Sequence, residues 1–130
     1  MRIIHIVASK SGGDRMQYYL NHRGEYDDYT TDVDIYNNDT DRIDRINRLN
    51  AINSFLRNNP TRDHWILTDQ YLYLQLLDLI SHLCPRPGDK LEIVDISHQA
   101  YPINGDQLND LSFMAAPTTL TFITAIGEVK

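Results

Sequence analysis

The feature that most constrains the fold is an apolar run near the start of the chain that ends in a short polar turn. The run from Ile3 to Ala8 is interrupted only by His5, and the turn from Ser9 to Gly13 follows it directly. A run of this length bounded by turn residues is typical of a buried strand. In an open α/β sheet such a turn lies at the carboxyl edge, where ligands bind and where the next helix directs its unpaired N–H groups toward an anion. The run and its turn therefore predict a ligand site at the carboxyl edge of a sheet.

Hydrophobic periodicity indicates that helices and strands alternate along the chain. The expected strands are 3–8, 33–36, 64–68, 90–96 and 119–126, and the expected helices are 14–22, 41–58, 69–84 and 105–116. The alternating Thr and apolar residues of 119–126 favour a sheet edge, with antiparallel pairing as one option. The last helix is expected to be packed rather than a mobile lid, because its apolar residues fall at helical spacing. The pattern predicts one α/β domain over residues 1–130, a doubly wound (Rossmann-like) sheet of about five mostly parallel strands with helices on both faces.

The most regular helix pattern lies in residues 41–58. Its apolar residues recur at spacings of three and four and predict one buried face, formed by Ile43, Ile46, Leu49, Ile52, Phe55 and Leu56. The expected core comprises Ile46, Leu49, Ile52, Leu67, Ile93 and Val94. The helix 69–84 has only a narrow polar stripe, so we expect a homodimer that buries part of its surface.

Composition narrows the classes of partner and compartment. Fifteen Asp and three Glu against twelve Lys and Arg give a net charge of −6, which disfavours binding of duplex nucleic acid through its phosphates. No run reaches the roughly eighteen apolar residues of a membrane span, and no leader peptide is recognisable, so we expect a soluble cytoplasmic protein without membrane contact. Cys84 is the single cysteine, which excludes an intrachain disulfide.

Polar side chains follow the predicted strands where the strands end. They are Ser9, Lys10 and Ser11; Asn37, Asn38 and Asp39; Thr68 and Asp69; and Asp95, Ser97 and His98. Parallel strands would bring these groups to one edge. The residues expected to bind an anionic small molecule are Ser9, Lys10, Ser11, Gly12, Gly13 and Thr68, since the glycines allow close backbone approach and Lys10 can neutralise a phosphate or carboxylate. The alternative is an ordinary turn, in which Ser, Thr and Asp only cap helices.

His98 is the expected proton-transfer residue of this edge. Imidazole titrates near neutral pH, and either Asp95 or Asp69 could orient it. The expected catalytic residues are therefore His98, Asp69 and Asp95. The alternative is that His98 is a loop histidine without function.

The sequence predicts neither a metal site nor a cofactor. The other histidines lack the spacing of zinc ligands. The acidic segment 25–44 invites a calcium interpretation, but a loop counted from Asp32 has Asn37 and Ile43 where an EF-hand requires Gly and Glu.

Two segments resemble known families. Residues 3–9 with the glycines after them, and residues 93–102 with His98, are similar to the first halves of formyltransferases and of two-domain glycosyltransferases. The formyltransferase signature has Asn two residues before its His and Pro directly after it, where this chain has Ile96 and Gln99. A two-domain glycosyltransferase needs a second domain, which we do not expect in these 130 residues. No residue role is carried over from either family.

Two hypotheses about function follow. In the first, the protein is a small enzyme or sensor that binds a nucleotide-like or phosphorylated metabolite at the strand ends, with metal-independent group transfer or bond cleavage as its chemistry (a transferase, hydrolase or lyase). In the second, it is a non-catalytic acidic interaction protein, such as an inhibitor or immunity-type factor, that acts through the Asp- and Tyr-rich segment 25–44.

Overall fold

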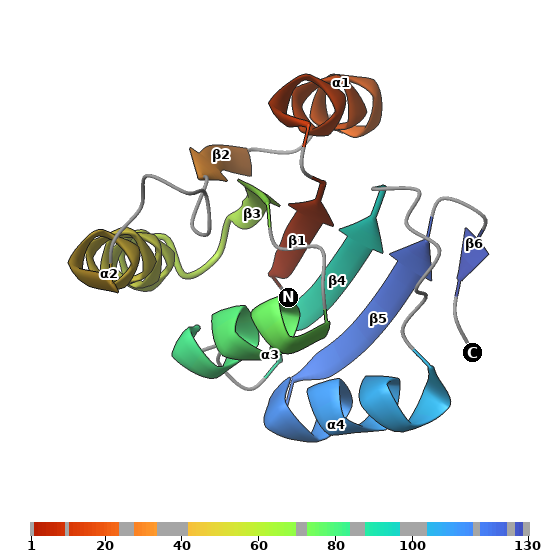
Figure 1. Cartoon of the computed structure of the whole chain (residues 1–130). Coiled ribbons are helices and arrows are strands. Elements are labelled where there is room, and N and C mark those ends of the chain that lie inside the picture. Colours follow the sequence, from red (N-terminus) through yellow and green to blue (C-terminus); the bar gives the residue numbers. More distant parts are fainter. Residues whose placement is uncertain are drawn as a thin grey trace.

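The computed structural model of the chain shows a sheet with four helices packed on it (Figure 1). It describes residues 2–9, 11–23, 28–33, 42–69, 73–83, 88–96, 104–115, 118–124 and 127–128. The strands are β1 (Ile3–Ala8), β2 (Asp28–Val33), β3 (Asp63–Thr68), β4 (Lys90–Asp95), β5 (Thr119–Thr124) and β6 (Gly127–Glu128). The helices are α1 (Gly12–His22), α2 (Arg42–Asn58), α3 (Tyr73–His82) and α4 (Gly105–Ala115). None of the helices within the described ranges is long and apolar enough to cross a membrane.

The strands form one sheet in the order β2-β3-β1-β4-β5-β6. Neighbouring strands from β2 to β5 pair in parallel, and β6 pairs with β5 in the antiparallel sense. The predicted α/β class with a parallel sheet is therefore confirmed.

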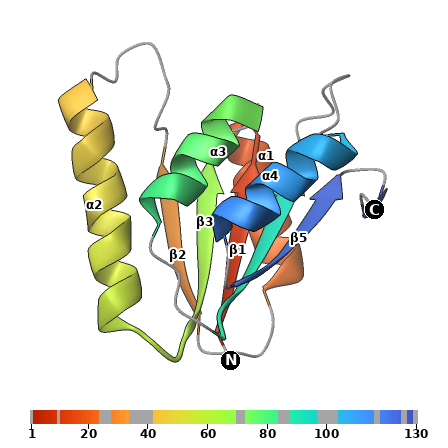
Figure 2. The same cartoon turned by 90° about the horizontal axis from the view of Figure 1, so that it is seen from below.

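The helices are divided unequally between the two faces of the sheet. The connection from β1 to β2 runs toward one edge, whereas the later connections run back toward the other edge. Right-handed crossovers then place α1 on one face and α2, α3 and α4 on the opposite face, as Figures 1 and 2 show. We call these the α1 face and the three-helix face.

The main core lies on the three-helix face. It is built almost entirely from aliphatic side chains of β1, β3, β4 and the three helices, among them Ile4, Ile6, Ile66, Leu79 and Ile93. A smaller cluster on the α1 face contains Val7, Trp65 and Leu67, with Tyr18 and Tyr19 packed against it.

Helix α2 buries a narrower stripe than its periodicity predicts. Leu49, Ile52 and Leu56 are buried, as expected, but Ile43 is 69% exposed and Ile46 is 41% exposed. The prediction of a buried Ile46 was therefore wrong. The physical reason is position: α2 is the outermost helix of its layer, beside β2, so within the described part of the chain it has a helix neighbour on one side alone (Figure 2).

Helix α3 lies between α2 and α4, which explains its apolar composition. Leu76, Leu79 and Ile80 are buried within the chain itself. These residues therefore need no second subunit to cover them, and the homodimer remains a prediction without structural support.

Two expected strands differ from the observed ones. Strand β2 spans Asp28–Val33, upstream of the predicted 33–36, of which residues 34–36 lie outside the described part of the chain. Strand β5 pairs in parallel with β4 along its whole length and in the antiparallel sense with the two-residue β6 at Ile123 and Thr124. The expected edge position was therefore wrong, whereas the antiparallel option is confirmed for the contact with β6. Charged residues in β2 suit its place at the end of the strand order, because charge protects sheet edges from aggregation.

The segment 105–116 forms the packed helix α4, as expected. Its start is stabilised by a capping box, in which Gln107 N donates to Asn104 Oδ1 (2.9 Å) and Asn104 N donates to Gln107 Oε1 (3.1 Å). Leu111 and Ala115 are buried against the main core. For the described residues, the lid alternative no longer holds.

Candidate functional site

The carboxyl ends of three neighbouring strands meet at one edge of the sheet. Ala8 of β1 pairs with Thr68 of β3 on one side and with Asp95 of β4 on the other. Ser9 N donates to Thr68 O (3.0 Å), and Ile96 N donates to Ala8 O (3.1 Å), so the pairing continues past the last strand residues. The structure thus brings Ser9, Thr68 and the backbone of Asp95 together, as the sequence predicts.

The turn after β1 is built by its own serines. Ser9 Oγ accepts a hydrogen bond from Ser11 N (3.2 Å), and Ser11 Oγ accepts one from Asp14 N (3.2 Å). Ser11 is therefore the N-cap of α1, which begins at Gly12, two residues before the predicted start. Within the described residues, this arrangement leaves the N–H groups of Gly12 and Gly13 for solvent or a ligand.

Burial divides the expected ligand-binding residues into two sets. Ser9 and Thr68 are buried, and Ser9 Oγ supports the turn by accepting from Ser11 N. Ser11 and Gly13 are exposed and Gly12 is half-buried. A ligand at this edge would therefore meet the start of α1 before it met the strand ends.

Arg15 is the residue of this site that sequence reasoning missed. Its side chain is 1% exposed, and its guanidinium Nη1 donates to the carbonyl oxygen of Ser9. Its Nη2 would lie 3.5 Å from a Cβ added to Gly12, so the guanidinium lies directly beneath the turn. The hydropathy pattern does not predict that Arg15 is buried, because an arginine in the first turn of an amphipathic helix is normally exposed to solvent. The one local signal was the pair of glycines before it, which leave room for a long side chain to fold back.

Several expected site residues lie outside the described part of the chain. They include Lys10 and His98, together with Asn37, Asn38, Asp39 and Ser97. Asp69 is half-buried directly after β3, and Asp95 is described only by its place in β4. The proton-transfer role of His98, with Asp69 or Asp95 as its partner, stays a prediction.

The acidic segment 25–44 is described only at 28–33 and 42–44. Among the described residues, no group of three or more His, Cys, Asp or Glu side chains is placed to hold a metal ion.

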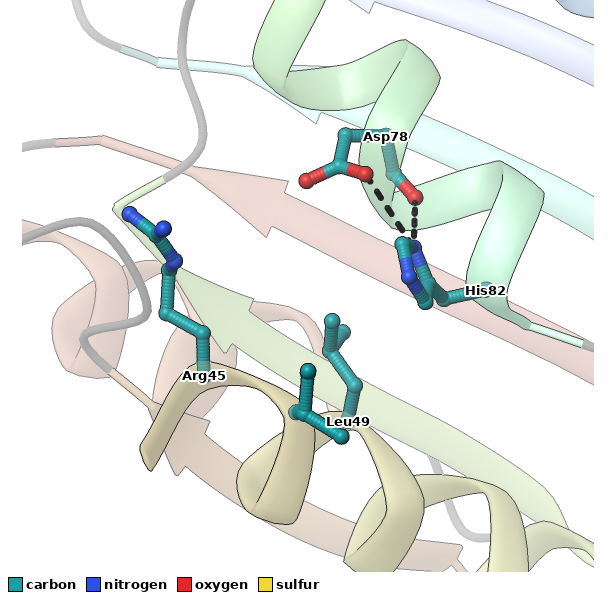
Figure 3. A pocket seen from close by; sticks show the side chains of 5 residues that line it. Arg45, Leu49, Asp78 and His82 are labelled. Carbon is teal, nitrogen blue, oxygen red and sulfur yellow. Dashed lines mark hydrogen bonds and ion pairs between the residues drawn. The ribbon is translucent and has the colours of Figure 1, made fainter. Parts of the chain in front are cut away.

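A pocket of about 250 Å³ lies between α2 and α3, on the three-helix face, and is lined by Arg45, Ile46, Leu49, Asp78 and His82 (Figure 3). None of these residues belongs to the predicted strand-end site. Comparison with protein-family models, with curated proteins and with solved structures finds no match to this chain.

Proposed function

We propose that this protein is a small enzyme or sensor that binds a phosphorylated or nucleotide-like metabolite at the start of α1, on a doubly wound, Rossmann-like sheet. The observation that carries the proposal is the turn after β1, in which the serine cap leaves two glycine N–H groups above a buried guanidinium. Groups at a helix start that point toward an anion, together with the helix dipole, are a recurrent way to bind phosphate.

The electrostatics of the turn support an anionic ligand. The whole chain carries a net charge of −6, yet the side chain beneath this turn is a buried arginine. A guanidinium remains protonated in a protein and is less screened when water is excluded around it. Lys10, in the same turn, would add a second positive charge.

The chemistry would be group transfer or bond cleavage at the phosphorylated end of the ligand. His98 would move the proton, and Asp95 or Asp69 would orient the imidazole. Asp95 ends β4 in register with Ala8 of β1, so its backbone lies beside the strand end that leads into the turn. If the bound metabolite is released unchanged, the protein is a sensor.

The binding test uses a variant that lacks the N–H group of Gly12 but keeps the helix. Gly12 is the first residue of α1 and follows an extended Ser11, a position that accepts proline. Calorimetric titration with inorganic phosphate, adenosine monophosphate and a sugar phosphate should show binding of at least one probe. Gly12→Pro should weaken that binding about tenfold or more, because a hydrogen bond to a charged group is lost.

The matched control is Gly105→Pro, since Gly105 is the first residue of α4. This variant should bind the same probe as the parent does. Absence of binding of all three probes by the folded parent protein, or equal weakening in both variants, would refute the proposal.

The catalytic part is tested separately by following the bound probe with ³¹P NMR. Conversion of the probe, slowed by about 10²- to 10⁴-fold in His98→Ala with little change in affinity, would support proton transfer by His98. A probe that is converted as fast by His98→Ala as by the parent would remove that role.

A further inference from the structure

A buried histidine lies beneath the last turn of α2. His64 of β3 is 1% exposed, and its ring lies 5.2 Å from that of Phe55. Its register partners are Ile4 on β1 and Tyr29 on β2. Burial favours the neutral form of an imidazole, because a charge that is removed from water is unfavourable. The C-terminal end of α2 therefore covers a group whose protonation is opposed by burial.

Arg2 connects the same end of α2 to the sheet. Its Nη1 donates to the carbonyl oxygens of Leu56 (2.5 Å) and Asn59 (3.2 Å), where the helix ends. Its Nε and Nη2 donate to the two carboxylate oxygens of Asp89, which precedes β4. Figure 2 shows that α2 ends at the edge of the sheet where β1 begins. The docking of this helix end therefore depends on one guanidinium whose other donors are held by a carboxylate.

The charges around His64 also oppose its protonation. Burial, followed by the positive charge of Arg2, lowers the pKa of His64 to about 4. Two carboxylates lie at the same edge of the sheet. Asp89 is paired with Arg2, and Asp63 accepts a backbone N–H of β1 (2.9 Å). A protonated His64 would therefore face a second cation, while both of these carboxylates already have donors.

Helix α2 is the element of the three-helix face that can open most easily. Within the described part of the chain it has a helix neighbour on one side alone (Figure 2). At that neighbour, Asn53 Nδ2 donates to the carbonyl oxygen of His82 (2.5 Å), whereas Asn53 Oδ1 is buried and has no partner among the described residues. Water would satisfy this acceptor once the helix moves away. A local opening at the end of α2 therefore costs less free energy than unfolding of the whole chain.

We propose that residues 52–59, which we call the α2 latch, form an acid-sensitive device: protonation of His64 releases them from the sheet while the other strands and helices stay folded. Release lets water reach the imidazole and separates the helix end from Arg2. It also exposes Ile52 and Leu56, which are buried in the closed state. Acid would thus display an apolar helix face. The latch lies at the amino edge of the sheet, so the inference is independent of the phosphate site at the carboxyl edge.

The size of the effect follows from the linkage between protonation and opening. In the open state the pKa of His64 returns to its ordinary value of 6.5, whereas in the closed state it is about 4. Protons therefore bind the open state more tightly, and the open state gains population as the pH falls below 6.5. Between pH 7 and pH 5 the population of the open state should rise about twentyfold.

Amide hydrogen exchange, followed by mass spectrometry at pH 7 and pH 5 and corrected for the intrinsic exchange rate, measures this opening. The amides of the α2 latch should be less protected than those of α4, and their protection should fall about twentyfold at pH 5. Low concentrations of urea should hardly change their exchange, because a local opening exposes little surface. Latch amides with the same protection and urea dependence as those of α4 would overturn the proposal, since α2 would then open only with the whole molecule.

Variants assign the trigger and the connection. His64→Leu should abolish the fall in latch protection at pH 5, whereas His82→Gln, at an exposed position of α3, is the matched control and should keep it. Arg2→Lys keeps the charge but loses the fork of donors, so it should lower latch protection about tenfold already at pH 7. The same fall at pH 5 in His64→Leu as in the parent, or parental protection in Arg2→Lys, would refute the proposal. The comparison of the latch with α4 in the parent protein needs no variant, so it decides the matter if a variant does not fold.

Discussion

The two faces of the sheet are built from different kinds of side chain. The three-helix face is covered mainly by aliphatic residues, and the buried ion pair between Arg2 and Asp89 lies at the end of α2, where Arg2 donates to the carbonyl oxygen of Leu56. The α1 face carries a row of paired residues, Trp65, His5 and Glu92, across β3, β1 and β4. The His5 ring stacks on Trp65 at 4.0 Å, and His5 Nδ1 lies 3.4 Å from Glu92 Oε1. Aliphatic packing therefore dominates the three-helix face, whereas on the α1 face a stacked aromatic pair and an ion pair lie side by side on the sheet.

Two histidines, one on each face of the sheet, show how this difference affects protonation. His64 is the in-register partner of Ile4 and lies on the three-helix face, with its ring 5.2 Å from that of Phe55. Burial, with a smaller contribution from the charge on Arg2, lowers the pKa of His64 to about 4. On the α1 face, the hydrogen bond from His5 is the main cause that lowers the pKa of Glu92. The same residue type is thus kept neutral on one face and paired with a carboxylate on the other.

The largest expected effect comes from shortening core side chains on the two faces. Ile66 and Leu67 are both fully buried and point to opposite faces of β3. Ile66→Ala should lower the free energy of unfolding by about 4 kcal/mol, and Leu67→Ala by about 2 to 3 kcal/mol. The cavity at Leu67 costs less because α1 has no helix neighbour on its face among the described residues and can move toward the sheet. Helix α3, which covers the other face, is held between two helices. Urea denaturation measures both. Equal costs would show that the two faces do not differ in their ability to relax.

Acidification should destabilise the protein through His64. A histidine whose pKa is lowered in the folded state contributes stability above its unfolded pKa of 6.5 and loses that contribution as the pH falls toward 4. The loss should reach about 3 kcal/mol. Denaturation curves between pH 7 and 4 would measure it, and His64→Leu should flatten the pH dependence. An unchanged slope in that variant would assign the acid sensitivity to other groups.

The ion pair on the α1 face should contribute less. A double-mutant cycle of His5→Gln and Glu92→Gln at pH 6 should give a coupling free energy of about 0.5 to 1 kcal/mol, because both side chains are partly exposed to solvent. The lowered pKa of Glu92 places the loss of its contribution below the ordinary pKa of 4.5, on the acid side. A coupling energy of zero would leave the stacking on Trp65 as the only energetic role of His5.

The smallest effect is expected at the start of α2. Ile43 is 69% exposed, so Ile43→Ser should change the free energy of unfolding by no more than about 0.5 kcal/mol. Leu49→Ala, two turns later in the same predicted apolar face, should cost about 2 to 5 kcal/mol. Similar costs for the two substitutions would mean that the first turns of α2 are covered by a surface that the described residues do not include.

Much of the candidate site could be predicted from the strand ends alone. Parallel strands bring their carboxyl ends together, so the meeting of Ser9, Thr68 and Asp95 follows once the strands are recognised. The burial of Arg15 could not be predicted, because it depends on how closely α1 approaches β1. The pocket between α2 and α3 could not be predicted either, since its lining residues come from two helices that are distant in the chain and become neighbours only in the fold.

Side-chain periodicity was enough to predict the local elements: the apolar run of β1, the extents of α2 and α4, and the alternation of helices and strands that makes an α/β chain. These features depend on side-chain periodicity over a few residues, which local physical chemistry encodes. The strand order, the place of β5 between β4 and β6, and the exposure of Ile46 depend instead on contacts between distant segments. The reason is that burial depends on which distant segment covers a face, and a periodic pattern marks the apolar face of a helix without specifying what lies against it.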